Sequence, residues 1–233
     1  MHSQLANHQL VNQTSGVCEY YSPPPLVDAS RELMGGIDLD PASTTKANTA
    51  IVKADRFYRR PEVTVHYDDL IGDLPIHTQQ GWGSLERQWN GNVWMNHPFG
   101  VLERACKPGC SKKVCQRRGH HLGADIPGNV EWVTHVINEY ESGRVSQACI
   151  LTFASTSEAW FKPLKKYPIC FLDGRTNYLD PETLLEVNGV TKGSCVTYLG
   201  TRLMRFEKVF SAFGEVKVSL STLRDLNIIG DLL

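Results

Sequence analysis

The chain has 233 residues, of which 41% are hydrophobic, and its formal net charge is −1 at neutral pH. This length and hydrophobic content suit one globular domain with a sizeable core. The sequence has no apolar run of the roughly 20 residues that span a bilayer. It also has no overall basic charge, so a nucleic-acid-binding surface would have to be a local cluster.

The N-terminal segment 1–20 is polar and lacks the hydrophobic region of a signal peptide. We therefore expect a flexible leader over 1–20, one domain over 21–233 and a cytoplasmic location. The seven cysteines are odd in number, and three of them lie between positions 106 and 115. This spacing favours a reduced protein with a local metal site over a disulfide framework.

The first predicted helix begins at Pro24, carries Leu26, Ala29, Ser30 and Leu33 on one face, and ends at the glycine pair that follows Met34. Residues 37–41 predict a short strand that ends at a proline. Residues 42–90 give no clear pattern. Residues 92–95 predict a second short strand.

After an insert at 104–128 that is rich in Cys, Lys, Arg and Gly, strands and helices alternate. Helices are predicted over 130–140, 158–166 and 203–213, and strands over 148–153, 169–172, 195–199 and 215–220. Such alternation predicts a layered α/β sheet.

Two of the predicted strands end in polar sequences, Asp38–Ser43 and Asn96–Gly100. Ligands of open α/β sheets bind at the carboxyl ends of strands, so both motifs are candidate site elements. A carboxylate of the first motif can accept a hydrogen bond from a bound amino-acid moiety, or it can cap the following helix. No G-x-G-x-x-G fingerprint lies near it, which argues against a nicotinamide cofactor.

The second motif has the parts needed to hold a planar NH2 group. The amino group of a nucleobase is a poor nucleophile because its lone pair is delocalised, and two hydrogen-bond acceptors would localise that pair. The Asn96 side chain and the His97 carbonyl are such acceptors, Pro98 keeps the segment extended, and Phe99 can stack on an extracted base. An ordinary strand-to-loop turn is the alternative reading of these four residues.

Several segments in the right order resemble the phage-type DNA N6-adenine methyltransferases, the Dam family of phages and prophages. The resemblance runs from about Tyr21 to about Val216. The segments that carry it are Ser22-Pro23, Ile37–Ala42, Asp68–Leu70, Trp89–Gly100, Ile150–Phe161, Phe171–Arg175 and Ser194–Phe206.

This resemblance implies a Rossmann-like, S-adenosylmethionine-dependent methyltransferase fold, with a mostly parallel sheet, helices on both faces and a small Cys/His-rich insert. It implies an enzyme that methylates N6 of adenine in double-stranded DNA, on a base flipped out of the duplex, inside a bacterial host. The implied catalytic residues are Asn96, His97, Pro98 and Phe99. The implied cofactor-site residues are Ser22, Pro23, Asp38, Asp40, Pro41 and Asp69. The alternative role for Asp38 is structural, with its side chain pointing into the sheet or pairing there instead of binding the cofactor.

The sequence departs from the family at three positions. His97 stands where the family usually has proline, Phe99 replaces the commoner tyrosine, and Asp173 stands where arginine is common. The His97 carbonyl remains, and stacking needs only a ring. Three alternatives keep the fold and change the acceptor to cytosine N4, RNA or a glutamine amide. A fourth is an inactive DNA-binding relative in which His97 marks lost activity.

The insert contains Cys106, Cys110 and Cys115, followed by His120 and His121. Three thiolates and one imidazole form a recognised zinc site, and Pro108-Gly109 provides a tight turn between the first two thiols. The pattern therefore predicts a zinc knuckle with His120 as fourth ligand and His121 as its alternative; a flexible reduced loop is the other interpretation.

The insert is also the most basic stretch of the chain, and it directly follows the Asn96–Gly100 motif. A run of charge is usually a solvated face. Here we expect it to contact DNA phosphates. The residues expected to do so are Lys112, Lys113, Arg117 and Arg118.

Overall fold

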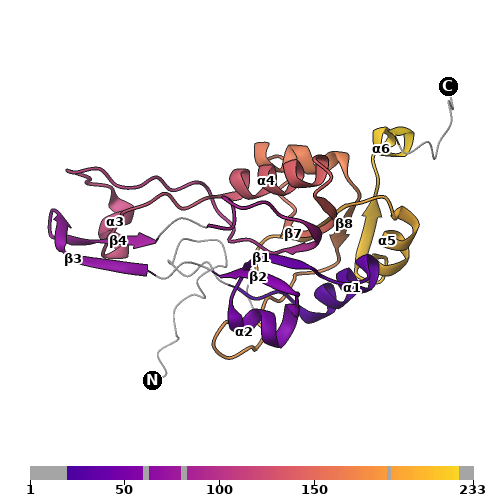
Figure 1. Cartoon of the computed structure of the whole chain (residues 1–233), viewed down its shortest axis with the longest axis horizontal. Coiled ribbons are helices and arrows are strands. Elements are labelled where there is room, and N and C mark those ends of the chain that lie inside the picture. The colour runs from indigo at the N-terminus through magenta and orange to yellow at the C-terminus, as the bar shows by residue number, and fades with distance from the viewer. Residues whose placement is uncertain (1–19, 60–62, 80–82, 188–189, 226–233) are drawn as a thin grey trace, which may run out of the picture.

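The computed structural model describes residues 20–59, 63–79, 83–187 and 190–225, so the predicted leader lies outside it except for Tyr20. The strands form a seven-stranded main sheet and a separate three-stranded sheet. The small sheet projects from one end of the main body (Figure 1). Within the described ranges, no helix has the length and apolar character needed to cross a membrane.

The main sheet is mixed, with strand order β10-β8-β9-β7-β5-β1-β2. Its strands are β1 (Leu39–Ser43), β2 (Arg56–Arg59), β5 (Gly91–Met95), β7 (Val145–Phe153), β8 (Ile169–Leu172), β9 (Ser194–Leu199) and β10 (Gly214–Lys217). The pairs β2–β1, β1–β5 and β5–β7 are parallel, whereas β7–β9, β9–β8 and β8–β10 are antiparallel.

The predicted α/β layering is therefore confirmed, but the sheet is parallel only in the half from β2 to β7. The chain passes from β7 to β8 and then returns to place β9 between them, so β9 runs antiparallel to both neighbours. Buried strands of either orientation show the same short apolar run, so the sequence pattern could not distinguish these directions.

Helices cover both faces of the main sheet. On one face lie α1 (Pro24–Met34), the short α2 (Thr45–Ala47), the π-helical turn η1 (Asn48–Val52) and α5 (Leu203–Phe210). On the other lie α4 (Asn129–Glu141) and the 3-10 helix η2 (Ala159–Lys166). Helices on both faces were expected, and Figure 1 shows α4 and α1 on opposite sides of the strands.

Alternation along β5 divides the core between these two faces. Trp94 packs with the α1 and α5 cluster, whereas Val93 and Met95 pack with the α4 and η2 cluster. All three side chains are fully buried. Because the side chains of a strand point alternately to the two faces, Asn96 continues on the α1 side and His97 on the α4 side.

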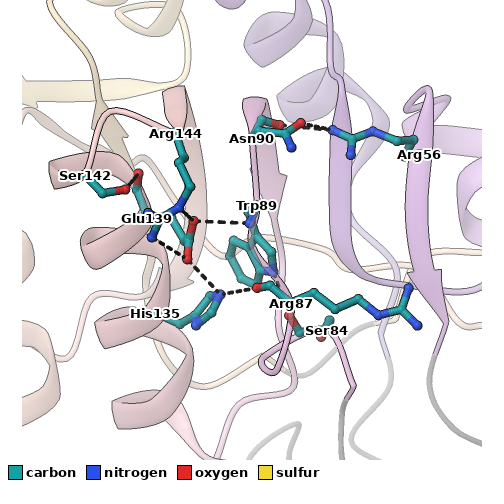
Figure 2. A network of polar contacts seen from close by, with 9 residues as sticks. All are labelled: Arg56, Ser84, Arg87, Trp89, Asn90, His135, Glu139, Ser142 and Arg144. Atoms are coloured by element: carbon teal, nitrogen blue, oxygen red, sulfur yellow. Dashed lines mark hydrogen bonds and ion pairs between the residues drawn. The ribbon is translucent and has the colours of Figure 1, made fainter.

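A polar network joins the start of β5 to α4 (Figure 2). The buried Glu139 carboxylate accepts hydrogen bonds from the Trp89 backbone N–H at 3.2 Å and from Arg144 at 2.6 and 3.1 Å. His135 lies 3.7 Å from the same carboxylate and contacts the Arg87 carbonyl. The network fixes the amino end of β5, which is opposite to the end that carries Asn96.

The small sheet has the order β3-β4-β6. Its strands are β3 (Val63–Ile71), β4 (Leu74–Gln79) and β6 (His121–Leu122), and α3 (Lys113–Arg118) packs beside it. We call the described residues 63–79 and 101–126 the arm. The β3–β4 hairpin comes from the stretch whose sequence gave no clear pattern, and it pairs with a strand of the Cys/His insert.

Most predicted elements lie close to their observed bounds. The helix from Pro24 ends at Gly35, which is left-handed with φ 86°. The strand predicted over 169–172 is observed unchanged, and the one predicted over 37–41 lies two residues later. The strand predicted over 215–220 ends at Lys217, because Ser219 accepts a hydrogen bond from the Thr222 N–H and starts α6 (Leu220–Asp225).

Candidate active site

A cavity lies at the carboxyl ends of the neighbouring parallel strands β1 and β5. Its empty space, open solvent included, is about 610 Å³. From β1 the chain continues to β2 on one side, and from β5 it continues to β7 on the other. The cavity therefore occupies the switch point of the sheet, where α/β folds bind ligands.

Asn96 lines this cavity with a fixed amide orientation. Its Nδ2 lies 3.3 Å from the Tyr20 carbonyl oxygen and 3.1 Å from Ser22 Oγ. A backbone carbonyl can only accept, so the atom that faces it must be the NH2 group. No hydrogen bond to Oδ1 is found among the described residues, which leaves this oxygen available as an acceptor at the cavity.

Ser22 also has a defined role in this geometry. Its Oγ accepts from the Trp94 indole N–H at 3.2 Å as well as from Asn96. These two donors occupy both lone pairs of the Ser22 oxygen, so the hydroxyl can still donate its own hydrogen to another acceptor. Ser22 is buried and lines the cavity, and it therefore presents a donor to a bound ligand.

The residues after Asn96 continue along the cavity wall. His97, Pro98 and Phe99 all line it. The His97 carbonyl receives no hydrogen bond from any part of the chain that the structure describes. Two consecutive residues that line the cavity thus each carry an oxygen acceptor without a hydrogen bond in the described part of the chain, Asn96 Oδ1 and the His97 carbonyl.

The His97 side chain points to the α4 side and serves as an anchor. Its Nε2 lies 2.9 Å from Asn129 Oδ1, which also receives the Gly100 N–H at 3.5 Å. Because Oδ1 accepts, Nε2 carries the proton. Burial lowers the pKa of His97 to about 4, against a small opposing effect of the Asn129 hydrogen bond. His97 is therefore neutral at physiological pH and fixes the loop to the start of α4.

Phe99 belongs to an aromatic cluster at the cavity. Its ring centroid lies 4.3 Å from Phe153 and 6.0 Å from Tyr178, which meets it edge-on. Tyr178 is fully buried and its hydroxyl bonds Ser194 at 3.0 Å. Packing from two sides holds the Phe99 ring in one place, as a stacking surface for a planar ligand requires.

On the β1 side, the cavity holds a buried carboxylate. Asp40 is 3% exposed, and one of its oxygens accepts the Ala42 N–H at 3.1 Å. Burial raises the pKa of Asp40 to about 6, although hydrogen bonds from Ser43 and Ala42 oppose the shift. Next to it, Thr44 caps α2 and bonds the Tyr21 hydroxyl at 2.7 Å.

The structure brings together only part of the predicted cofactor set. Ser22 and Asp40 line the cavity. Pro23 precedes α1, and Pro41 is buried within β1. Asp38 Oδ2 accepts the Asn92 N–H at 2.6 Å and so joins β1 to β5, which is the structural alternative expected for it.

Asp69 lies in β3 of the small sheet, and its side chain is outside the described residues.

Several lining residues were missed by sequence reasoning. Thr44 carries a local signal, because its hydroxyl accepts the Ala47 N–H in the manner of a helix cap. Tyr178 carries none, since it comes from a loop between β8 and β9 that reaches the cavity only through the tertiary fold.

The three predicted thiol ligands converge within the arm, but with His121 rather than His120 as the histidine. Cys106, Cys110, Cys115 and His121 place one ligand atom each within 4.8 Å of all the others. They could hold a metal ion. The cluster selects His121 over His120: the first is fully buried, and the second stacks on His77 with ring centroids 3.7 Å apart. Of the two adjacent histidines, only His121 lies in β6 and in the cluster.

The four predicted DNA-contacting cations are not equivalent. Lys112, Lys113 and Arg117 are exposed on or beside α3. Arg118 forms an ion pair with Glu103 and is only 15% exposed. Arg118 therefore stabilises the arm, whereas the other three are available to a partner.

Comparison of the chain with protein-family models, curated proteins and solved structures found no match.

Proposed function

We propose that the chain is an enzyme that transfers a methyl group from S-adenosylmethionine to N6 of an adenine in DNA. The observation that carries this proposal is the pair of free acceptors, Asn96 Oδ1 and the His97 carbonyl, beside the fixed ring of Phe99. The choice of adenine and of DNA follows the sequence resemblance to phage-type adenine methyltransferases.

The two acceptors would bind the two hydrogens of the amino group. This draws the nitrogen lone pair out of conjugation and toward the reacting methyl group. The Asn96 amide is held by Ser22 and Tyr20 before any substrate arrives, so little reorganisation is needed. Phe99 would cover one face of a base that has been flipped out of the duplex.

The β1 side of the cavity offers a carboxylate and a hydroxyl that would suit S-adenosylmethionine, which when bound supplies an electrophilic methyl group on its sulfonium. The buried Asp40 carboxylate suits the ammonium or hydroxyl donors of this molecule. The Ser22 hydroxyl, whose hydrogen remains to be donated, suits its carboxylate. Asp40 and Ser22 would hold the cofactor, while Asn96 and the His97 carbonyl would hold the base.

The proposal includes double-stranded DNA as partner and zinc as a structural ion. Lys112, Lys113 and Arg117 would contact phosphates. The Cys/His cluster lies in the arm, away from the strand ends that form the cavity (Figure 1), so zinc bound there would take no part in methyl transfer.

The test is methyl transfer to unmethylated DNA, followed by mass spectrometry of the digested nucleosides. The wild-type chain should form N6-methyladenine. Asn96→Ala should reduce the rate by at least about 100-fold, the usual effect of removing one preorganised polar group. Asn138→Ala, on the exposed face of α4, is the matched control and should leave the rate unchanged.

Each other result has a defined meaning. N4-methylcytosine as the product would contradict the choice of adenine, and methylation of RNA alone would contradict the choice of DNA. DNA binding without any methyl transfer would favour the inactive relative. Full activity of Asn96→Ala would overturn the role of this cavity.

A further inference from the structure

We propose that Cys106, Cys110, Cys115 and His121 bind one zinc ion, and that this ion assembles the arm from two segments distant in the sequence. The inference concerns the fold of the arm, and it stands whether or not the chain transfers methyl groups.

The sulfur positions fit a tetrahedral metal. Cys106 Sγ lies 3.5 Å from Cys115 Sγ, and Cys110 Sγ lies 3.9 Å from Cys115 Sγ. Sulfurs bound to one tetrahedral zinc at about 2.3 Å stand about 3.8 Å apart. The two sulfur pairs are therefore spaced as in a tetrahedral zinc site, and all four ligand atoms lie within 4.8 Å of one another.

His121 provides an independent reason for a ligand. It is 0% exposed, and neither of its ring nitrogens has a hydrogen-bond partner in the described part of the chain. Burying a polar group without a partner is costly, and native proteins seldom do so. Metal coordination would satisfy one of the nitrogens.

Local backbone contacts help to position the thiols. Gly109 has φ 77°, and the Cys110 N–H bonds the Lys107 carbonyl at 3.1 Å, which closes the predicted turn. Cys115 is on the buried side of α3. The Leu122 N–H lies 3.5 Å from Cys106 Sγ, the type of contact that orients and stabilises a metal-bound thiolate.

The described part of the arm has little apolar burial of its own, although ion pairs such as Arg118 with Glu103 also join its segments. Its buried residues, among those described, are Ile71, Cys115, His121 and Leu122. None of them belongs to either hydrophobic cluster of the main body. Among the described residues, the strand pairing between the hairpin and the insert has two residue pairs, Ile76 with His121 and His77 with Leu122, and the His77 and His120 rings stack beside it. A unit this small with so little apolar burial needs a metal or a similar crosslink.

The first measurement is the zinc content of the purified full chain, supported by the absorption spectrum after cobalt substitution. We expect one zinc per chain and a cobalt spectrum typical of tetrahedral thiolate coordination. His121→Ala should abolish binding. His120→Ala, which removes the neighbouring ring that stacks on His77, should keep it. His121→Cys should also keep it, because zinc accepts four thiolates.

These variants separate loss of the ligand from loss of the fold. If His121→Ala does not fold, His121→Cys still tests the proposal. A His121→Cys protein that folds but binds no zinc would overturn the proposed zinc site. Equal loss of zinc in His120→Ala and His121→Ala would also overturn it, as would a wild-type chain that remains metal-free after zinc is added under reducing conditions.

The second measurement is hydrogen exchange with and without a zinc chelator. Removal of zinc should increase exchange across 74–79 and 106–122, and should leave α4 and β7 unchanged. Unchanged exchange in β4 on metal loss would overturn the assembling role even if zinc binds.

Discussion

At the residue scale, Asp40 lies at the cavity and is buried, so its negative charge destabilises the folded chain. Its pKa in the folded chain is about 6, against an ordinary value of 3.8, because it is buried. The folded state therefore holds the proton more tightly than the unfolded state, and the stability of the wild-type chain falls as the pH rises from about 4 to about 6.

Asp40→Asn should consequently be more stable than the wild-type chain at neutral pH. Asparagine keeps an oxygen for the Ala42 N–H but carries no charge. The gain should be on the order of 1–3 kcal/mol, since one pKa unit corresponds to about 1.4 kcal/mol. Urea unfolding at several pH values measures it.

The gain should shrink below pH 4, and exposed Asp173→Asn is the control. A gain that does not vary with pH would contradict this account. Under the proposed function the same variant should bind S-adenosylmethionine more weakly.

Glu139 is also a buried carboxylate but, unlike Asp40, it forms an ion pair with Arg144 and accepts several hydrogen bonds (Figure 2). Burial alone would raise its pKa, but hydrogen bonds from Arg144 and the Trp89 N–H outweigh this, so the pKa lies below its ordinary value. Its stabilising effect is therefore present at neutral pH and is lost as the pH falls through the folded pKa.

Glu139→Gln should lower the free energy of unfolding by about 1–3 kcal/mol at neutral pH, because it leaves Arg144 and its neighbours without a charged acceptor. The range allows for the partial exposure of Arg144. Glu141→Gln is the matched control: its ion pair with Lys166 is half exposed, and the change should cost less than about 1 kcal/mol. Equal costs in denaturant unfolding would show that burial of the network adds nothing.

At the scale of elements, the contact between β1 and β5 depends on Gly91. Its φ is 79°, and a Cβ there would lie 2.3 Å from Asp38 Oδ2. That oxygen accepts the Asn92 N–H, so a methyl group at position 91 would displace the link between the two strands that form the cavity.

Gly91→Ala should destabilise the chain by about 2–4 kcal/mol, the sum of left-handed backbone strain and steric overlap. Gly143→Ala separates the two effects: its φ is 78°, but no atom lies within 4 Å of the added Cβ. The control should cost only about 1 kcal/mol. Chemical unfolding of both variants makes the comparison, and similar costs would mean that Asp38 moves aside freely.

Local signals predicted the elements whose ends are marked in the sequence. Pro24 and Gly35 bound α1, and the apolar run at 92–95 gave β5 with Asn96 at its end. The β3–β4 hairpin was not predicted, because its register shifts between His66 and Leu70 and interrupts the alternation. The choice of His121 over His120 depends on the pairing of β6 with β4, which is a long-range contact.

At the scale of the whole molecule, the cavity lies in the main sheet, and exposed cations lie on the arm. The arm projects from the main body (Figure 1). The net charge is only −1, so association with DNA would depend on where the cations lie. Lys113 and Arg117 are one turn apart on α3, and Cys115 lies on the opposite, buried side. The same short helix thus faces the metal cluster with one side and solvent with the other.

The triple variant of Lys112, Lys113 and Arg117 to Ala should therefore weaken DNA binding across sequences. Each lost phosphate contact should reduce the slope of log K against log salt by about 0.9, or roughly 2–3 in total. A titration of labelled duplex at several salt concentrations measures both quantities. The control removes three exposed lysines of η2 and α5, Lys162, Lys165 and Lys208, and so changes the net charge equally.

If the arm binds the duplex, the two triple variants must differ, because a general effect of net charge would act on both alike. An equal loss of affinity in both would assign the interaction to overall charge and remove the arm from recognition. Arg118→Ala should act differently again: it leaves Glu103 unpaired, so increased hydrogen exchange in the arm should accompany any loss of binding. The three variants together distinguish direct phosphate contact from support of the arm.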